Sequence, residues 1–213
     1  MSTKKDIQDI QIFKIITLGD SGVGKTSIIK RYCEKIFDDN NQSTIGINFS
    51  MKEMIVGRKN KIKLKLIDTC GQEKYRALAK TYYKHADVVL FVFSMNDKES
   101  FDAINWWIES FNINTDKEGI PKYLVGTKND LEIKIEQSLI EELSQKNSIK
   151  FISTSAKKNN NIDQLFEEIG NELYLKFIKK GDLPQINLQI NDNDDNKEIK
   201  KRNRCCKVNM TNL

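Results

Sequence analysis

The sequence predicts an α/β fold: a doubly wound, mostly parallel sheet of six strands, with one antiparallel strand at its edge and helices on both faces. Short apolar runs, such as Val88–Phe93 and Tyr123–Val125, are typical of strands that are buried on both sides. Helix-like patterns of apolar residues lie between and after these runs, over 101–111, 138–146 and 162–178. The alternation of strands and helices favours a parallel sheet, because a parallel strand requires a crossover connection.

The first part of the chain supplies the remaining elements in order. An apolar strand over 12–18 leads into a glycine-rich loop, and a helix follows over 27–32. Residues 37–44 are polar and have the composition of a surface loop. A strand over 45–56, a short turn and a strand over 62–67 with strictly alternating apolar and basic residues predict a hairpin with one buried face.

Composition divides the chain into three regions. We expect a flexible N-terminus over 1–9, one domain over 10–178 and a disordered tail over 179–213, where Asn, Asp, Gln and Lys dominate. The formal charge of +5 is scattered, which argues against a nucleic-acid interface. No apolar run approaches the roughly 20 residues of a membrane-spanning helix, and no signal-peptide core is present, so we expect a cytosolic protein. The isolated Cys33 and Cys70 fit a reducing compartment.

Residues 19–26, Gly-Asp-Ser-Gly-Val-Gly-Lys-Thr, match the phosphate-binding pattern G-x-x-x-x-G-K-[ST]. The glycines let backbone N–H groups face phosphate oxygens, and the following helix adds the positive end of its dipole. We expect Lys25 to contact the β- and γ-phosphates as a catalytic residue, and Thr26 to ligate Mg²⁺. The pattern alone is shared by ATPases, kinases and GTPases. The residues of this region predicted to contact nucleotide are Asp20, Ser21, Gly22, Val23, Gly24, Lys25, Thr26 and Ser27.

Two short motifs after strands point to guanine as the base. The Asp130 carboxylate can accept two hydrogen bonds from the N1–H and exocyclic amine of guanine, a pair of donors that adenine lacks. The aliphatic part of Lys128 can lie along the base. The second motif follows a strand over 150–152 and is expected to offer a backbone N–H to the guanine O6. The residues predicted to surround the base are Thr127, Lys128, Asp130, Ser155, Ala156 and Lys157.

In this order and spacing, the motifs of residues 10–178 resemble the small G domain of the Ras superfamily, a P-loop NTPase, and within it the Rab family. The Rab resemblance rests on residues 44–49, Thr-Ile-Gly-Ile-Asn-Phe, on 82–84, Tyr-Tyr-Lys, and on a cysteine pair near the end. The spacing between the two base motifs leaves no room for the extra helix of Rho proteins. The resemblance implies GTP or GDP as the bound nucleotide and Mg²⁺ as the cofactor.

The resemblance also implies roles for single residues. Phe37 would pack on the guanine edge, and Thr44 would ligate Mg²⁺ and sense the γ-phosphate. Asp68 would hold Mg²⁺ through water, Gly71 would donate its N–H to the γ-phosphate, and Gln72 would position the attacking water as the second catalytic residue. The implied effector surface consists of Ile45, Gly46, Phe49, Ile67 and Tyr82.

Three positions depart from the family pattern. Thr127 stands where Asn is usual, but Rho-like GTPases also use Thr there, so guanine binding is still expected. Ile67 replaces an aromatic residue through which Rabs display their switch state, and this change reshapes the effector surface. Cys70 places a thiol beside the γ-phosphate site where Ala is usual.

The tail resembles the doubly prenylated end of Rab proteins, because Cys205 and Cys206 follow a basic cluster. Two lipid chains, or one with a basic patch, make membrane anchoring stable. Seven residues follow the pair, more than is usual for Rabs, so two unmodified cysteines are the alternative.

The sequence therefore predicts a monomeric, Rab-like switch that hydrolyses GTP slowly. It would recruit effectors to the cytoplasmic face of an intracellular membrane for vesicle trafficking, under an exchange factor and a GTPase-activating protein. The alternatives are a Ras- or Rho-like signalling GTPase outside vesicle traffic, a P-loop ATP-dependent kinase, and a scaffold that binds GTP without hydrolysing it.

Overall fold

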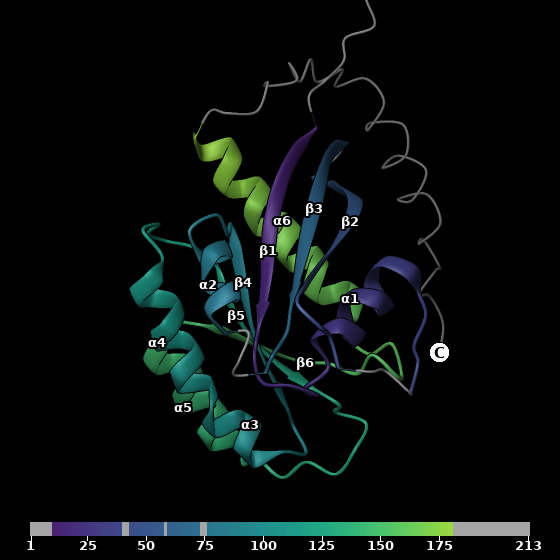
Figure 1. The fold of residues 1–213 in the computed structure, drawn as a ribbon. Coiled ribbons are helices and arrows are strands. Elements are labelled where there is room, and N and C mark those ends of the chain that lie inside the picture. The colour runs from purple at the N-terminus through teal and green to yellow at the C-terminus, as the bar shows by residue number, and fades with distance from the viewer. Residues whose placement is uncertain (1–9, 40–42, 58, 73–75, 181–213) are drawn as a thin grey trace, which may run out of the picture. The chain divides into compact units, whose positions relative to one another are not determined.

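The computed structural model describes residues 10–39, 43–57, 59–72 and 76–180. The predictions for 1–9 and for most of the tail, including Cys205 and Cys206, lie outside the described residues. The chain divides into two units, Met1–Lys176 and Phe177–Leu213, and the described part of the second is the end of the last helix. The elements (Figure 1) are β1 (Gln11–Leu18), α1 (Lys25–Glu34), β2 (Ile47–Val56), β3 (Asn60–Thr69), α2 (Arg76–Tyr83), β4 (Val88–Ser94), α3 (Lys98–Asp102), α4 (Ile104–Asn114), β5 (Lys122–Thr127), α5 (Gln137–Asn147), β6 (Lys150–Ser153) and α6 (Ile162–Lys180).

The six strands form one sheet in the order β2-β3-β1-β4-β5-β6. β2 pairs with β3 in an antiparallel hairpin, and the other pairs are parallel, which confirms the predicted fold class. In register, Ile15 of β1 lies between Leu66 of β3 and Val88 of β4. Because the parallel strands run in one direction, the loops after β1, β3, β4 and β5 emerge at the same edge of the sheet.

Two apolar layers form because alternate residues of each strand point to opposite faces. One face carries a buried cluster that includes Ile16, Phe91 and Leu124 of the strands together with side chains of α2, α4 and α5. On the opposite face, Tyr32 of α1 stacks on Phe166 of α6 with ring centroids 3.9 Å apart. None of the described helices is long and apolar enough to span a bilayer.

The helices differ from the prediction in several places, including α1, which begins two residues before and ends two residues after the predicted 27–32. The helix expected over 101–111 is two helices, α3 and α4, which meet at Ala103. α6 extends to Lys180, two residues past its predicted end. α2 was not predicted, because the buried positions that are described for it, Ala79 and Tyr83, make too short a pattern to recognise.

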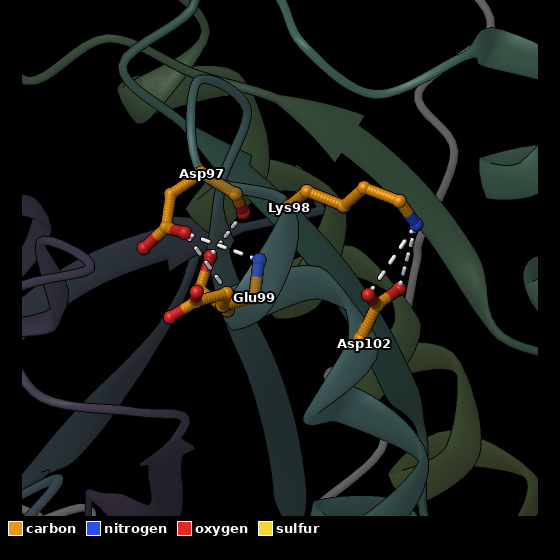
Figure 2. A network of polar contacts seen from close by, with 5 residues as sticks. Asp97, Lys98, Glu99 and Asp102 are labelled. Carbon is orange, nitrogen blue, oxygen red and sulfur yellow. Dashed lines mark hydrogen bonds and ion pairs between the residues drawn. The ribbon is translucent and has the colours of Figure 1, made fainter.

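α3 begins at Lys98, before the apolar pattern over 101–111 starts, and the Asp97 side chain explains this early start. Its carboxylate accepts a hydrogen bond from the backbone N–H group of Glu99 at 3.1 Å, as Figure 2 shows. It also accepts one from the backbone N–H group of Ser100 at 3.4 Å. These bonds satisfy donors that a helix start leaves without partners. Lys98 also pairs with Asp102 one turn later, at 3.2 Å. A side-chain cap therefore begins α3 before its first buried residue.

We expect Asp97→Ala to lower the free energy of unfolding by about 1 kcal/mol, because two backbone donors lose their acceptor. Lys98→Ala removes an exposed ion pair and serves as the control, with an expected loss of about 0.5 kcal/mol or less. Urea unfolding of both variants measures the difference. Equal stability of the two variants would contradict the capping role.

Candidate nucleotide-binding site

A cavity of about 310 Å³ lies at the edge of the sheet where β1, β3 and β5 end. Its wall combines the glycine-rich loop, the start of α1, the polar loop before β2 and both base motifs. Residues that are far apart in sequence therefore meet around one space. The predicted residues that line it are Ser21, Gly22, Gly24, Lys25, Thr26, Ser27, Phe37, Thr44, Gly71, Thr127, Lys128, Asp130, Ala156 and Lys157.

The glycine-rich loop fits closely against the sheet. A Cβ atom on Gly19 would lie 2.0 Å from the Val92 carbonyl oxygen, so only glycine allows the loop this approach. Gly24 has a φ of 102°, and α1 begins directly after it without a side-chain cap. The first N–H groups of α1 are thus available to an anion in the cavity.

Lys25 is almost completely buried, with 5% of its surface exposed. Its ammonium group donates hydrogen bonds to the carbonyl oxygens of Gly19, at 2.8 Å, and Asp20, at 2.6 Å. Burial lowers the pKa of Lys25 to about 8, although the nearby Asp68 carboxylate opposes this shift. A phosphate group in the cavity would favour the charged form of Lys25, so anion binding compensates for the cost of its burial.

Three oxygen-bearing side chains meet beside Lys25. The Thr26 hydroxyl lies 2.6 Å from the Thr44 hydroxyl and donates to Oδ2 of Asp68 at 2.7 Å. Burial raises the pKa of Asp68, against the opposing effects of the Thr26 hydrogen bond and the Lys25 charge. Its Oδ1 atom has no hydrogen-bond partner among the described residues. Hydroxyl and carboxylate oxygens, one of them unsatisfied, are the donors that Mg²⁺ prefers, so these residues fit that ion.

The two base motifs are joined by a hydrogen bond from the Ser155 hydroxyl to Oδ1 of Asp130, at 2.6 Å. Ser155 is completely buried and does not line the cavity, so it orients Asp130. The Thr127 hydroxyl lies within hydrogen-bonding distance of the Val23 and Phe93 carbonyl oxygens. Thr127 therefore connects the base motif to the phosphate loop at the position where the family usually has Asn.

Asp20 does not line the cavity, and its side chain has partners elsewhere. Its Oδ1 atom accepts a hydrogen bond from the ring N–H of Trp107, at 2.9 Å, and lies 3.5 Å from Nη2 of Arg76. The carboxylate thus faces α4 and α2, because the fully buried Trp107 ring requires an acceptor for its N–H. The Arg76 guanidinium also lies over Trp106, with 4.2 Å between its Cζ atom and the ring centroid.

Two further residues that were predicted to belong to the site, Val23 and Gln72, do not line the cavity. The Val23 side chain is buried, with 1% of the residue's surface exposed, and its carbonyl oxygen lies within hydrogen-bonding distance of the Thr127 hydroxyl. Gln72 follows Gly71 and is partly exposed, but it does not line the cavity. Its catalytic role stays a prediction, as do the nucleotide contacts assigned above.

Arg31 is a site residue that the sequence did not reveal. From α1 it donates through Nε to the Ala156 carbonyl oxygen, at 2.6 Å, and its Cζ atom lies 5.8 Å from the centroid of the Phe37 ring. Arg31 therefore contacts both the Ala156 motif and Phe37, the two segments that are predicted to lie on either side of the base. The only signal in the sequence is its position three residues after Ile28, on the same side of the helix.

Only some of the predicted effector residues are exposed. The rings of Phe49 and Tyr82 lie 5.7 Å apart between centroids, and Ile45 is 78% exposed. Ile67 is 1% exposed, so it supports this surface from below. The backbone N–H of Cys70 donates to the Gly46 carbonyl oxygen at 3.1 Å and joins the two segments that reach the phosphate end.

The geometry agrees with the comparison to known proteins. The model of the Ras family matches residues 14–175. The chain is 37% identical to Ras-related protein Rab-11B of Dictyostelium discoideum over 195 residues, which cover 90% of this chain and 86% of that protein. It is 36% identical to Rab-13 of Canis lupus familiaris over 167 residues, or 78% and 81% of the two chains. It is 35% identical to Rab-8A of Pongo abelii over 178 residues, or 82% and 85%.

The family model covers most of the chain, and the matched region contains the whole cavity. Members of this family bind GTP and GDP and hydrolyse GTP, which fits a cavity with a buried lysine at one end and a carboxylate at the other. The protein therefore belongs to the Ras family and is a small GTPase of the Rab type.

Proposed function

We propose that this GTPase works as a Mg²⁺-dependent switch whose output is the recruitment of effectors to a membrane. The observation that carries the proposal is the cluster of Thr26, Thr44 and Asp68 oxygens: Thr26 and Thr44 line the cavity together with Lys25, and Asp68 accepts a hydrogen bond from Thr26. Thr26 and Thr44 would ligate the ion, and Asp68 would hold it through water. When bound, Mg²⁺ would neutralise charge on the phosphates.

The switch follows from contacts that depend on the γ-phosphate. Thr44 precedes β2 and Gly71 follows β3, and both line the cavity. The hydrogen bond between Cys70 and Gly46 ties these two segments to each other. Loss of the γ-phosphate would release both contacts together, and the surface around Phe49 and Tyr82 would change with them.

Hydrolysis without a partner is expected to be slow. Lys25 stabilises charge on the phosphates and Gln72 would position water. Among the described residues no arginine lines the cavity: Arg31 contacts Ala156 and Arg76 contacts Asp20. We therefore expect an intrinsic rate of roughly 10⁻⁴ to 10⁻³ s⁻¹, the range of unassisted Ras, which an activator's arginine could raise by several orders of magnitude.

The variant Gln72→Leu tests the proposal. Single-turnover hydrolysis of GTP should fall by about tenfold or more, because water loses its orienting group, while GDP affinity stays within about twofold because Gln72 does not line the cavity. Gln164→Leu, an exposed glutamine on α6, is the matched control and should behave as the unaltered protein. An unchanged hydrolysis rate in Gln72→Leu would refute the assigned role.

The setting that we propose is vesicle trafficking, the role of the Rab family. The protein would act as a monomer in the cytosol and on the cytoplasmic face of an intracellular membrane, with prenyl groups on Cys205 and Cys206. An exchange factor, a GTPase-activating protein and effectors would control and read its state. Mass spectrometry of the C-terminal peptide from the native cell tests the anchor, and an unmodified peptide would refute it.

A further inference from the structure

Beyond Phe49, which contacts Tyr82 of α2, β2 is covered by described elements on only one face. Lys52 points toward α1, where its ammonium group donates to the Cys33 carbonyl oxygen at 3.2 Å, and Met54 lies against Gly170 of α6. The alternating residues on the other face are exposed, with 52% exposure for Met51 and 65% for Ile55. Among the described elements, no helix covers this part of the sheet, which Figure 1 shows as the ends of β1 and β3 that extend beyond α2.

We call this surface the lysine face. Its members share one side of three adjacent strands and lie in register with one another. Two of its apolar side chains lie on β2 and one, Ile12 at 44% exposure, lies on β1. Glu53 is the single carboxylate among four lysines. The lysine face consists of Ile12 and Lys14 of β1, Lys61, Lys63 and Lys65 of β3, and Met51, Glu53 and Ile55 of β2.

The charges of the lysine face are not balanced within it. Glu53 pairs with Lys63 at 2.9 Å. Lys14 and Lys65 are direct cross-strand partners, an arrangement of like charges that destabilises a sheet. Lys61, Lys63 and Lys65 also follow one another on the same side of β3. An anionic surface opposite these lysines would remove their mutual repulsion.

The anionic surface opposite these lysines could belong to a lipid bilayer or to an acidic protein. The position of the lysine face favours the bilayer. The Tyr174 hydroxyl of α6 accepts a hydrogen bond from Asn60 at 2.6 Å, so this helix reaches the β2–β3 turn, where Lys61 and Ile55 lie. The chain continues from α6 into the tail that carries the proposed lipid anchor. Lysines between exposed aliphatic side chains also suit a lipid interface, where the stems contact the apolar layer and the ammonium groups contact headgroups.

We propose that the lysine face binds the surface of an anionic bilayer and thereby turns this face of the G domain toward the membrane. The inference deepens the proposed membrane location, but it concerns a contact that does not require lipid on the cysteines. An unlipidated protein tests it, so its failure is distinct from failure of the anchor or of the nucleotide switch.

The experiment is co-flotation of the full-length, GDP-loaded chain, produced in bacteria, with two kinds of vesicle. One contains phosphatidylcholine alone and the other contains phosphatidylcholine with phosphatidylserine. The test variant combines Lys61→Gln, Lys63→Gln and Lys65→Gln. The control combines Lys84→Gln, Lys98→Gln and Lys146→Gln, which removes the same charge from exposed positions elsewhere. Thermal unfolding and GDP affinity establish that both variants are folded.

We expect the phosphatidylserine vesicles to bind the test variant roughly tenfold or more weakly than the control. Each lysine near an anionic surface contributes separately to the free energy of binding. Glu53→Lys should strengthen binding about fivefold or more, since it removes the carboxylate and adds a cation. Equal binding of the test and control variants to phosphatidylserine vesicles would overturn the proposal. The lysine face would then contact an acidic protein or remain exposed to solvent. Equal binding to both kinds of vesicle would overturn it as well.

Discussion

Asp130→Asn is expected to weaken GDP binding by roughly 10²- to 10⁴-fold, because the two charge-assisted hydrogen bonds that we propose between Asp130 and guanine, each of about 1.5–3 kcal/mol, would be lost. The amide has the shape of the carboxylate, and its oxygen can still accept the hydrogen bond that Ser155 donates to Asp130 at 2.6 Å. The loop therefore keeps its support while the nitrogen of the amide faces the donors of guanine. Titration with a fluorescent GDP analogue measures the change.

Two comparisons make this result specific to the base. Glu132→Gln removes a carboxylate from an exposed position two residues away, and its GDP affinity should stay within about twofold of the original because a solvated surface charge contributes little. Xanthosine diphosphate carries an oxygen in place of the guanine amine, so it should bind Asp130→Asn better than GDP does. Unchanged GDP affinity in Asp130→Asn would rule out Asp130 as the residue that recognises guanine.

Lys25→Met is expected to weaken GTP binding by roughly 10²- to 10⁴-fold, since the ammonium group would make charge-assisted contacts with the β- and γ-phosphates, and to weaken GDP binding by less, since GDP offers it only the β-phosphate. The buried charge is costly without an anion, as the lowering of the Lys25 pKa to about 8 indicates. Methionine removes that cost but leaves the Gly19 and Asp20 carbonyl oxygens without their donor. The two effects on folding oppose each other, so we expect the melting temperature of the nucleotide-free protein to shift by only a few degrees.

GMP separates this prediction from a general loss of structure. It has neither a β- nor a γ-phosphate, so its affinity should be nearly equal in Lys25→Met and in the unaltered protein. Lys146→Met, at an exposed position on α5, controls for loss of a lysine. A parallel loss of GMP, GDP and GTP binding would show that Lys25 supports the fold of the site and does not act on the distal phosphates.

Much of the candidate site was predictable because its signals are local. The glycine-rich loop needs a backbone that only glycine can adopt beside Val92, and this need appears directly as glycines in the sequence. The strands were recognisable from apolar runs and from the alternation over 62–67. α2 was missed because it is short and the buried residues described for it, Ala79 and Tyr83, do not make a helical pattern. α3 begins early because the Asp97 side chain caps it.

The sequence by itself determined the strands, the phosphate loop, the order of the base motifs and the family. Only the tertiary structure decided which distant polar groups meet: Asp20 with Trp107, 87 residues away, and Arg31 with Ala156, 125 residues away. A hydrogen bond requires its two heavy atoms within about 3 Å, and that distance depends on how each helix packs on the sheet. Backbone conformation and apolar periodicity are properties of neighbouring residues, whereas these contacts are properties of the packed molecule.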